Sequence, residues 1–364
     1  MEGILLFILF ALTTGSFMYM LVCTDSNSKT PMGMIRRKIY ANGPSITKKL
    51  LGDKIFVKLQ QFYNYVFYTN NRLGQISYFL IFWVAFGLYG KFGLLKHFGN
   101  TPYVSHIHSV CGSLIFIFCN YFFYRTCTTS PGIITKENND EYVKQFEQYY
   151  DEVQYKQNTS CSTCNIIKPA RSKHCRICNV CVSRFDHHCI WVRQCIGQKN
   201  YKYFLLFLFT HIFLSLYGVV AGILCLFGIA QKQQLFKLTY KNAVTGEIHP
   251  ATFFRVFTVI TNRETFFVFI IFVCLIFFVT LTAFFLYHLN MIRKDLTTNE
   301  RIRKNDFEKS FLNEMYELQE QQKRKKDDDS IKRLAQLKQC WNSLSKRRVQ
   351  GLYEGLRIVY SQPN

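Results

Sequence analysis

The sequence predicts an α-helical multi-pass membrane protein of about five transmembrane helices, with a cytosolic cysteine-rich domain of short β-hairpins between the third and fourth spans. Two observations lead to this fold class. Hydrophobic residues make up 49% of the 364 residues, and much of this content lies in long uncharged runs. A run of ~18 or more apolar residues can cross the hydrocarbon core as a helix. Cysteines also cluster, because seven of the 14 lie between Cys161 and Cys195, together with three histidines.

Each predicted span follows from an apolar run. The expected spans are residues 4–22, 76–95, 104–124, 203–229 and 266–289. The first has neither a basic leading region nor a clear cleavage site, so we expect an anchor and not a removed signal peptide. Lys91 interrupts the second span, but a lysine near the end of a span can extend to the interface.

Charge predicts the topology, because cytosolic loops carry an excess of Lys and Arg. Residues 24–74 hold nine Lys or Arg against two Asp, and residues 290–364 hold 17 Lys or Arg against 11 Asp or Glu. The expected parts are an N-terminal anchor (1–23), a cytosolic basic loop (24–75), spans two and three (76–125), a cytosolic cysteine-rich domain (126–202), spans four and five (203–289) with a lumenal loop (230–265), and a cytosolic tail (290–364). The net charge of +22 therefore follows from membrane topology, and we expect no nucleic-acid partner.

The cysteine spacing predicts two zinc ions. Closely spaced cysteines beside histidines indicate metal in a reducing compartment, and structural zinc takes four sulfur or nitrogen ligands. Ten candidate ligands exceed the eight that two sites need. An interleaved arrangement uses Cys161, Cys164, His174 and Cys181 for one ion and Cys175, Cys178, His188 and Cys195 for the other. This leaves His187 and Cys189, although spacing alone does not exclude Cys189 as a ligand. The sequence shows no evident internal repeat.

The two surplus residues suggest chemistry. A thiolate is nucleophilic, and a neighbouring imidazole can take the thiol proton. Asp186 could orient His187, as the acid does in a hydrolase triad. The alternative is that His187 only packs and Cys189 is a spare or a ligand, which holds for most arbitrary His-Cys pairs. Here two clear spans flank the loop, which favours chemistry at a membrane surface.

At this point the sequence strongly resembles the DHHC protein S-acyltransferases (palmitoyltransferases). The resemblance rests on Asp186-His187-His188-Cys189 within the complete cysteine frame, and on Lys168-Pro169-Ala170-Arg171 before it. Two shorter motifs match as well, Ser130-Pro131-Gly132 after the third span and Thr297-Thr298-Asn299-Glu300 after the fifth. The match covers residues 74–300, and the leading anchor is similar to a subgroup with one added N-terminal span. The chain departs from the family at Arg193-Gln194, where Asn-Asn is usual.

The resemblance implies a function and a role for each site residue. Cys189 would attack palmitoyl-CoA, become S-acylated and pass the acyl group to a cysteine of a membrane-associated protein. His187 would be the general base, Asp186 its orienting partner, and His188 a zinc ligand, with Thr297 near Asp186. Two structural zinc ions would take the interleaved ligands. The family default is the endoplasmic reticulum or Golgi membrane, with the catalytic loop in the cytosol and lipids as further partners.

Basic residues near the motif could hold the CoA phosphates, since Lys and Arg are the usual partners of phosphate oxygens. The candidates are Lys168, Arg171 and Lys173, and a solvated surface is an equally good account of each. Two other functions compete with acyl transfer. A zinc adaptor without chemistry would not need Asp186 or His187. A transporter would usually show buried charge along its path, whereas these spans lack acidic residues at mid-depth.

Overall fold

A computed structural model describes residues 31–150, 155–242, 244, 246–324, 333 and 359–360. The chain divides into two compact units. We call Met1–Phe123 with Phe207–Ala283 the helical unit, and Tyr124–Leu206 with Phe284–Asn364 the cysteine-rich unit.

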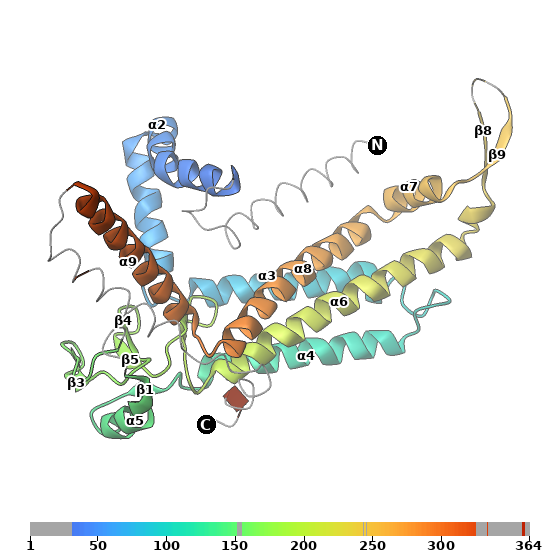
Figure 1. The fold of residues 1–364 in the computed structure, drawn as a ribbon. Coiled ribbons are helices and arrows are strands. Elements are labelled where there is room, and N and C mark those ends of the chain that lie inside the picture. Colours follow the sequence, from blue (N-terminus) through green and yellow to red (C-terminus); the bar gives the residue numbers. More distant parts are fainter. Residues whose placement is uncertain are drawn as a thin grey trace. The chain divides into compact units, whose positions relative to one another are not determined.

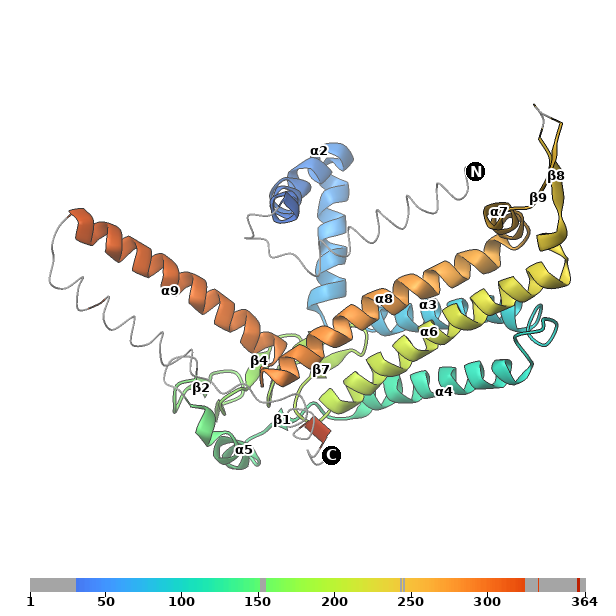
Figure 2. The same cartoon turned by 45° about the vertical axis from the view of Figure 1, so that its right-hand side comes forward.

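The described part of the chain contains four helices that are long and apolar enough to cross a membrane. They span Leu73–Leu94 (α3 with a π-helical end), Ile107–Thr128 (α4), Tyr201–Lys232 (α6) and Thr265–Arg293 (α8). Within the helical unit these helices lie side by side (Figures 1 and 2). They confirm four of the five predicted spans, and the first prediction, residues 4–22, lies outside the described residues.

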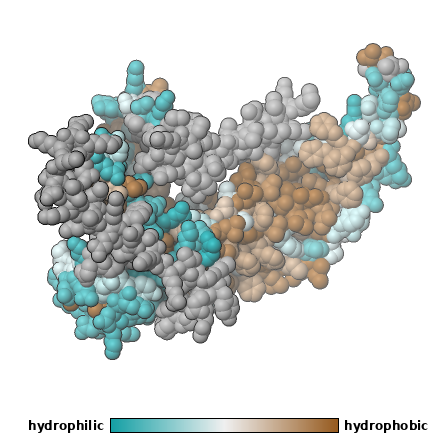
Figure 3. All heavy atoms as spheres, viewed as in Figure 1, coloured by the Kyte–Doolittle hydropathy of each residue, from teal (hydrophilic) through white to brown (hydrophobic). Residues whose placement is uncertain are grey.

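Apolar side chains cover the outer surface of these helices. Hydrophobic residues gather over the helices in Figure 3, and large ones such as Phe209, Ile223 and Val279 are exposed. Water would disfavour such a surface, whereas lipid tails solvate it. The exposed face therefore fits a bilayer.

Small residues let the helices approach one another closely. A Cβ atom added to Gly222 of α6 would lie 2.6 Å from Cγ1 of Ile271 in α8. Close backbone approach at small residues is a general device of membrane helices, because apolar burial gives little drive when the solvent is lipid. Polar bonds add to the packing, since the Tyr89 hydroxyl donates to the Gly218 carbonyl at 2.9 Å and the Tyr78 hydroxyl lies 2.8 Å from His211 Nε2.

The remaining elements of the helical unit are shorter or lie at its ends. The segment predicted as a basic loop contains helix α2 (Pro31–Tyr68), which is broken at Gly52, where φ is 77°. The predicted lumenal loop holds a 3₁₀ turn η3 (Leu235–Lys237), the hairpin β8 (Thr239–Lys241) with β9 (Ile248–Pro250), and helix α7 (Phe253–Arg263). The side of the membrane on which each loop lies stays a prediction.

The cysteine-rich unit confirms the expected short β-hairpins. Its strands form a three-stranded antiparallel sheet of order β1-β5-β4 and two further pairs, β2-β3 and β6-β7. Their bounds are β1 Ile133–Ile134, β2 Ser160–Cys161, β3 Ile166–Ile167, β4 Lys173–Cys175, β5 Val180–Val182, β6 His187–Cys189 and β7 Gln194–Ile196. Two short helices, α5 (Asn139–Gln145) and η2 (Glu147–Tyr149), precede the hairpins, and α9 (Thr298–Arg324) follows the last span.

The close contact at Gly222 yields a prediction about stability. Gly222→Ala should destabilise the helical unit by about 1–3 kcal/mol, because overpacking forces neighbouring atoms to shift. Equilibrium unfolding in detergent measures this change. The matched control is Gly87→Ala in α3, where an added Cβ meets nothing within 4 Å. Equal stability of the two variants would contradict the packing assigned to Gly222.

Candidate active site

The first cluster of metal-ligating side chains comprises Cys161, Cys164, His174 and Cys181, whose ligand atoms all lie within 4.8 Å of one another. His174 Nδ1 lies 3.6, 3.3 and 3.8 Å from the three sulfur atoms. A tetrahedral zinc ion with usual Zn–S and Zn–N bonds would place sulfur and nitrogen about 3.6 Å apart. The cluster therefore has the dimensions of a zinc site.

The second cluster repeats the first. It comprises Cys175, Cys178, His188 and Cys195, and His188 Nδ1 lies 3.7, 3.3 and 3.8 Å from the three sulfur atoms. In both clusters the histidine is 13, 10 and 7 residues from its three cysteines. This is an internal repeat, so the expectation that the sequence holds none is wrong. Repeated spacing is hidden by interleaving, because the second set begins before the first ends.

Turns with a left-handed residue bring each CxxC pair together. Asn165 and Asn179 follow the two pairs directly, with φ of 52° and 56°. Their backbone N–H groups donate to the carbonyls of Cys161 and Cys175, each at 2.8 Å. Asn tolerates this conformation better than most residues because its short polar side chain can hydrogen-bond locally. Each turn thus directs two thiols to one point.

Strand alternation separates the two clusters from one another and from the remaining pair. Successive side chains of a strand point to opposite faces. In β4, His174 therefore joins the first cluster while Cys175 joins the second. In β6, His188 joins the second cluster, so His187 and Cys189 lie together on the opposite face. The structure thus leaves the same two residues outside the clusters as the ligand count did.

The pair on that face is arranged for proton transfer. Nδ1 of His187 donates to Oδ2 of Asp186 at 2.7 Å, and the other ring nitrogen remains for the hydrogen bond between His187 and Cys189. Burial lowers the pKa of His187, but the bonds and charges of Asp186 and Cys189 outweigh burial and raise it to about 10. Burial likewise raises the pKa of Cys189, yet the bond and charge of His187 bring it below its usual value. The site can therefore hold an imidazolium beside a thiolate.

Asp186 is fixed by the first turn of α9. The backbone N–H of Thr298 donates to Oδ1 of Asp186 at 2.7 Å. Burial alone would raise the pKa of this carboxyl, but His187 and the Thr298 N–H outweigh it and hold the pKa below its usual value. The family resemblance implied Thr297 near Asp186, and the hydrogen bond to Asp186 comes from the backbone N–H of the next residue, Thr298. A helix N-terminus favours a negative charge, so this position suits an ionised aspartate.

The Thr297-Thr298-Asn299-Glu300 motif forms a capping box. Glu300 N–H donates to Oγ1 of Thr297 at 3.2 Å, and Thr297 N–H donates to Oε2 of Glu300 at 2.9 Å. Such reciprocal bonds satisfy two of the free N–H groups at a helix start. The motif thus begins α9 at the position that reaches Asp186.

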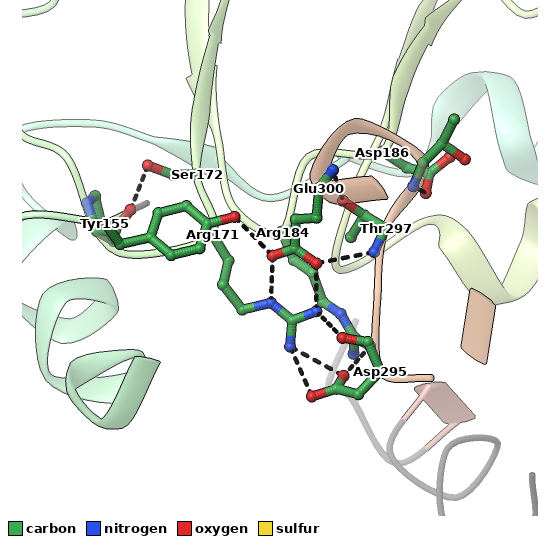
Figure 4. Close-up of polar contacts among 10 residues, drawn as sticks. Tyr155, Arg171, Ser172, Arg184, Asp186, Asp295, Thr297 and Glu300 are labelled. Carbon is green, nitrogen blue, oxygen red and sulfur yellow. Dashed lines mark hydrogen bonds and ion pairs between the residues drawn. The ribbon is translucent and has the colours of Figure 1, made fainter. Parts of the chain in front are cut away.

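Glu300 is also the partner of a buried arginine (Figure 4). Arg171 Nε and one terminal nitrogen donate to the two Glu300 oxygens at 2.7 and 2.8 Å, and the Tyr155 hydroxyl donates at 2.9 Å. Asp295 takes the remaining Arg171 bonds through its carboxylate and carbonyl, at 2.9 to 3.1 Å. The Arg171 and Glu300 side chains are 2% and 0% exposed, so solvent does not weaken this pair. It connects the cysteine-rich loop to α9.

The three residues predicted to contact the CoA phosphates differ in their surroundings. Every nitrogen of the Arg171 side chain bonds to a carboxylate or carbonyl oxygen, and the side chain is 2% exposed, so it is not placed to hold a CoA phosphate. That part of the expectation is wrong, because sequence does not distinguish a buried structural arginine from an exposed one. Lys173 is exposed at the surface, and its Nζ donates to Oδ1 of Asn299 at 2.7 Å. Lys168 is half-buried.

The departure at Arg193-Gln194 has a local role. Arg193 takes a left-handed conformation, with φ of 56°, in the turn between β6 and β7. Gln194 pairs with Cys189 across the two strands, and its amide donates to the carbonyls of Thr126 and Thr129. The glutamine therefore connects the strand opposite Cys189 to the end of α4.

Known proteins share the segment of the chain that forms this site. Residues 154–305 match the DHHC palmitoyltransferase family, so this segment is similar to a DHHC palmitoyltransferase domain. Palmitoyltransferase ZDHHC4 of Bos taurus is 30% identical over 218 residues, which cover 58% of this chain and 58% of that protein. The ZDHHC4 of Rattus norvegicus is 51% identical over 89 residues, 24% of this chain and 25% of the relative.

A fungal protein is also similar to this chain. Palmitoyltransferase swf1 of Schizosaccharomyces pombe is 35% identical over 160 residues, covering 43% of this chain and 42% of the relative. The chain thus spans little more than half the length of the bovine relative and less of the other two. The matched segment contains both metal-ligand clusters and the part of α9 up to residue 305.

The buried pair yields a prediction about α9. Glu300→Gln should lower the stability of the protein by about 3–5 kcal/mol, because it leaves the buried guanidinium short of one carboxylate. Equilibrium unfolding in detergent measures the loss. The matched control is Glu314→Gln on the same helix, whose side chain is 43% exposed and pairs with Arg333 at 3.1 Å. An exposed pair contributes about 1 kcal/mol or less, so equal losses would contradict the role of Glu300.

The division of the histidines yields a second prediction. His174→Ala or His188→Ala should lower the bound metal by about one ion per chain, because each removes a ligand from one four-ligand cluster. His187→Ala should leave the metal content unchanged, since His187 belongs to neither cluster. Elemental analysis of the purified variants measures this. Loss of metal from the His187 variant would overturn the ligand assignment.

Proposed function

We propose that this chain is a protein-cysteine S-palmitoyltransferase, which moves a long-chain acyl group from acyl-CoA to a protein thiol through an S-acyl intermediate on Cys189. The observation that carries the proposal is the position of Cys189 and His187 on one face of β6, opposite the ligand His188. An adaptor that only bound metal would not need a thiol, an imidazole and an aspartate joined in sequence by hydrogen bonds.

The geometry supports two successive acyl transfers. In the first, His187 takes the Cys189 proton, and Sγ attacks the thioester carbonyl carbon. The intermediate collapses, the C–S bond to CoA breaks, and the CoA sulfur leaves with the proton from His187. In the second, a substrate thiol loses its proton to His187 and attacks the carbonyl carbon of the acyl group on Cys189. The C–S bond to Cys189 then breaks, and the Cys189 sulfur takes the proton back from His187. Asp186 orients the imidazole and stabilises its charged form in both steps.

Both metal clusters support this proposal structurally. We assign one Zn²⁺ to each, because three thiolates and one imidazole at tetrahedral separation are a typical structural zinc site. When bound, the ions would cross-link the short hairpins that carry their ligands. Their role is to hold β6 in place, and no chemical step involves them.

A membrane setting suits the substrate. The acyl tail is apolar and the CoA head is polyanionic, so an active cysteine at the membrane surface can meet both parts. Burial of the tail among the spans would contribute about 0.8 kcal/mol per CH₂ group. Lys168 and Lys173 remain our candidates for the CoA phosphates. We place the enzyme in the endoplasmic reticulum or Golgi membrane, with its site facing the cytosol and membrane-associated proteins as acyl acceptors.

One labelling experiment tests the proposal. Purified protein in detergent is incubated with labelled palmitoyl-CoA and then treated with hydroxylamine, which cleaves thioesters. We expect a hydroxylamine-labile label on the wild type, no label on Cys189→Ser, and labelling slowed about 10²–10⁴-fold for His187→Ala, since a general base contributes about that factor.

The control for the cysteine is Cys111→Ser, because Cys111 is an exposed cysteine of α4 outside both clusters. We expect this variant to label like the wild type. Equal labelling of Cys189→Ser would sink the acyl-enzyme mechanism. No labelling of the wild type, with metal retained, would favour an adaptor that binds proteins without chemistry.

A further inference from the structure

A buried histidine near the proposed site has a ring nitrogen without a partner. His288 lies in α8, in the part of that helix that belongs to the cysteine-rich unit, and is 1% exposed. Its Nε2 has no hydrogen-bond partner among the residues that the structure describes. A buried donor or acceptor left unsatisfied costs about 1–3 kcal/mol. Such a group in a native protein calls for a ligand or a role.

The contact at the other ring nitrogen indicates which nitrogen of His288 carries the hydrogen. Nδ1 lies 2.9 Å from the hydroxyl of Tyr201. If the hydroxyl donates to Nδ1, the neutral ring bears its hydrogen on Nε2, and one buried donor is unsatisfied. If instead Nδ1 donates, both the phenol hydrogen and the Nε2 lone pair lack partners. The first arrangement leaves fewer buried groups unsatisfied, so we assign an N–H group to Nε2.

The ring of His288 lies near that of His187, the proposed base. The ring centroid of His288 lies 6.3 Å from that of His187 and 5.2 Å from that of Phe204. The ring centroids of Phe204 and His187 are 5.4 Å apart. The ring centroids of Phe284 and Tyr287 lie 4.6 and 5.4 Å from that of His288, both in edge-to-face arrangements. None of these described rings gives Nε2 a hydrogen-bond partner. A ligand oxygen entering from the side of His187 would therefore be the natural partner of Nε2.

The reaction proposed above creates such an oxygen. We propose that His288 Nε2–H donates a hydrogen bond to the carbonyl oxygen of the thioester bound at Cys189, and to the oxyanion formed from it. This inference rests on the proposed function. A donor fixed in a water-excluded site is worth more than one in water, and it needs no reorganisation as charge develops.

His288 keeps its hydrogen throughout both acyl transfers. When Cys189 Sγ bonds to the carbonyl carbon, the π electron pair of the carbonyl moves to oxygen, and His288 donates to that oxygen while keeping its hydrogen. When the pair returns, the C–S bond to CoA breaks, and the leaving sulfur takes its proton from His187. The same N–H serves the second transfer, in which the substrate sulfur attacks and Cys189 leaves.

The test compares two reactions of the same cysteine. Acylation by palmitoyl-CoA passes through an oxyanion, whereas alkylation by iodoacetamide displaces iodide and forms none. Both are followed by mass spectrometry of the Cys189 peptide in full-length protein. His288→Phe should slow acylation about 10²–10³-fold, as loss of one oxyanion donor does, and leave the alkylation rate unchanged. His288→Gln, which keeps an amide N–H at about the reach of Nε2, should recover part of the acylation rate.

The matched control is His211→Phe in α6. His211 is also buried, but both of its ring nitrogens have partners, the Phe207 carbonyl at 2.7 Å and the Tyr78 hydroxyl at 2.8 Å. We expect its ratio of acylation to alkylation to equal that of the wild type. If the Phe variant of His288 does not purify with its metal, His288→Leu makes the same comparison.

The remaining outcomes reject either the role of His288 or the proposed acyltransferase activity. Equal loss of acylation and alkylation in the His288 variants would mean that His288 only supports the structure, and unchanged acylation would remove it from the reaction. Either result leaves the proposed acyltransferase intact. Failure of the wild type to acylate Cys189 at all would instead reject the proposed function, on which this inference rests.

Discussion

Side chains on a β-strand alternate between two faces, and this constraint organises the cysteine-rich unit. Three consecutive residues of β6 have to serve two purposes. Because His188 points to a metal cluster, His187 and Cys189 have to share the other face, where a base and a nucleophile are useful. A shift of one residue in the pairing of β6 with β7 would exchange these roles completely. The metal clusters therefore matter to the chemistry because they fix the register of strands too short to fix it themselves.

A second constraint acts from far along the sequence. Asp186 can orient His187 only if it stays ionised although buried, and the first turn of α9 supplies the N–H that favours this state. The capping box positions that turn, and the Glu300 pair with Arg171 attaches it to the loop that carries the metal ligands. Replacing a buried ion pair by apolar residues is often neutral for stability. Its value here lies in placing two distant segments in one arrangement.

Much of the fold and site could be predicted from the sequence, for identifiable reasons. Apolar runs predicted four helices correctly, because span length is set by the bilayer, and ligand counting identified both clusters because zinc fixes the number of its ligands. Tertiary contacts could not be predicted. Arg171 looked like a phosphate ligand because its carboxylate partners lie far along the chain, and the unpartnered nitrogen of His288 depends on the packing of aromatic rings. The capping role of Glu300 was readable, since Thr-x-x-Glu is a common start of a helix.

The left-handed turns carry one more consequence. Asn165 and Asn179 follow the two CxxC pairs, and Arg193 takes the same conformation at the same distance after Cys189. Cys189 thus opens a third turn of this type, in which Val192 stands where each metal cluster has its second cysteine. The backbone N–H groups of Val192 and the residue before it still point to the sulfur, as the equivalent groups do at the first cluster. Cys189 therefore lies in a turn of the type that holds a metal-ligating thiolate, and its sulfur has the backbone N–H groups of a ligand although it belongs to neither metal cluster.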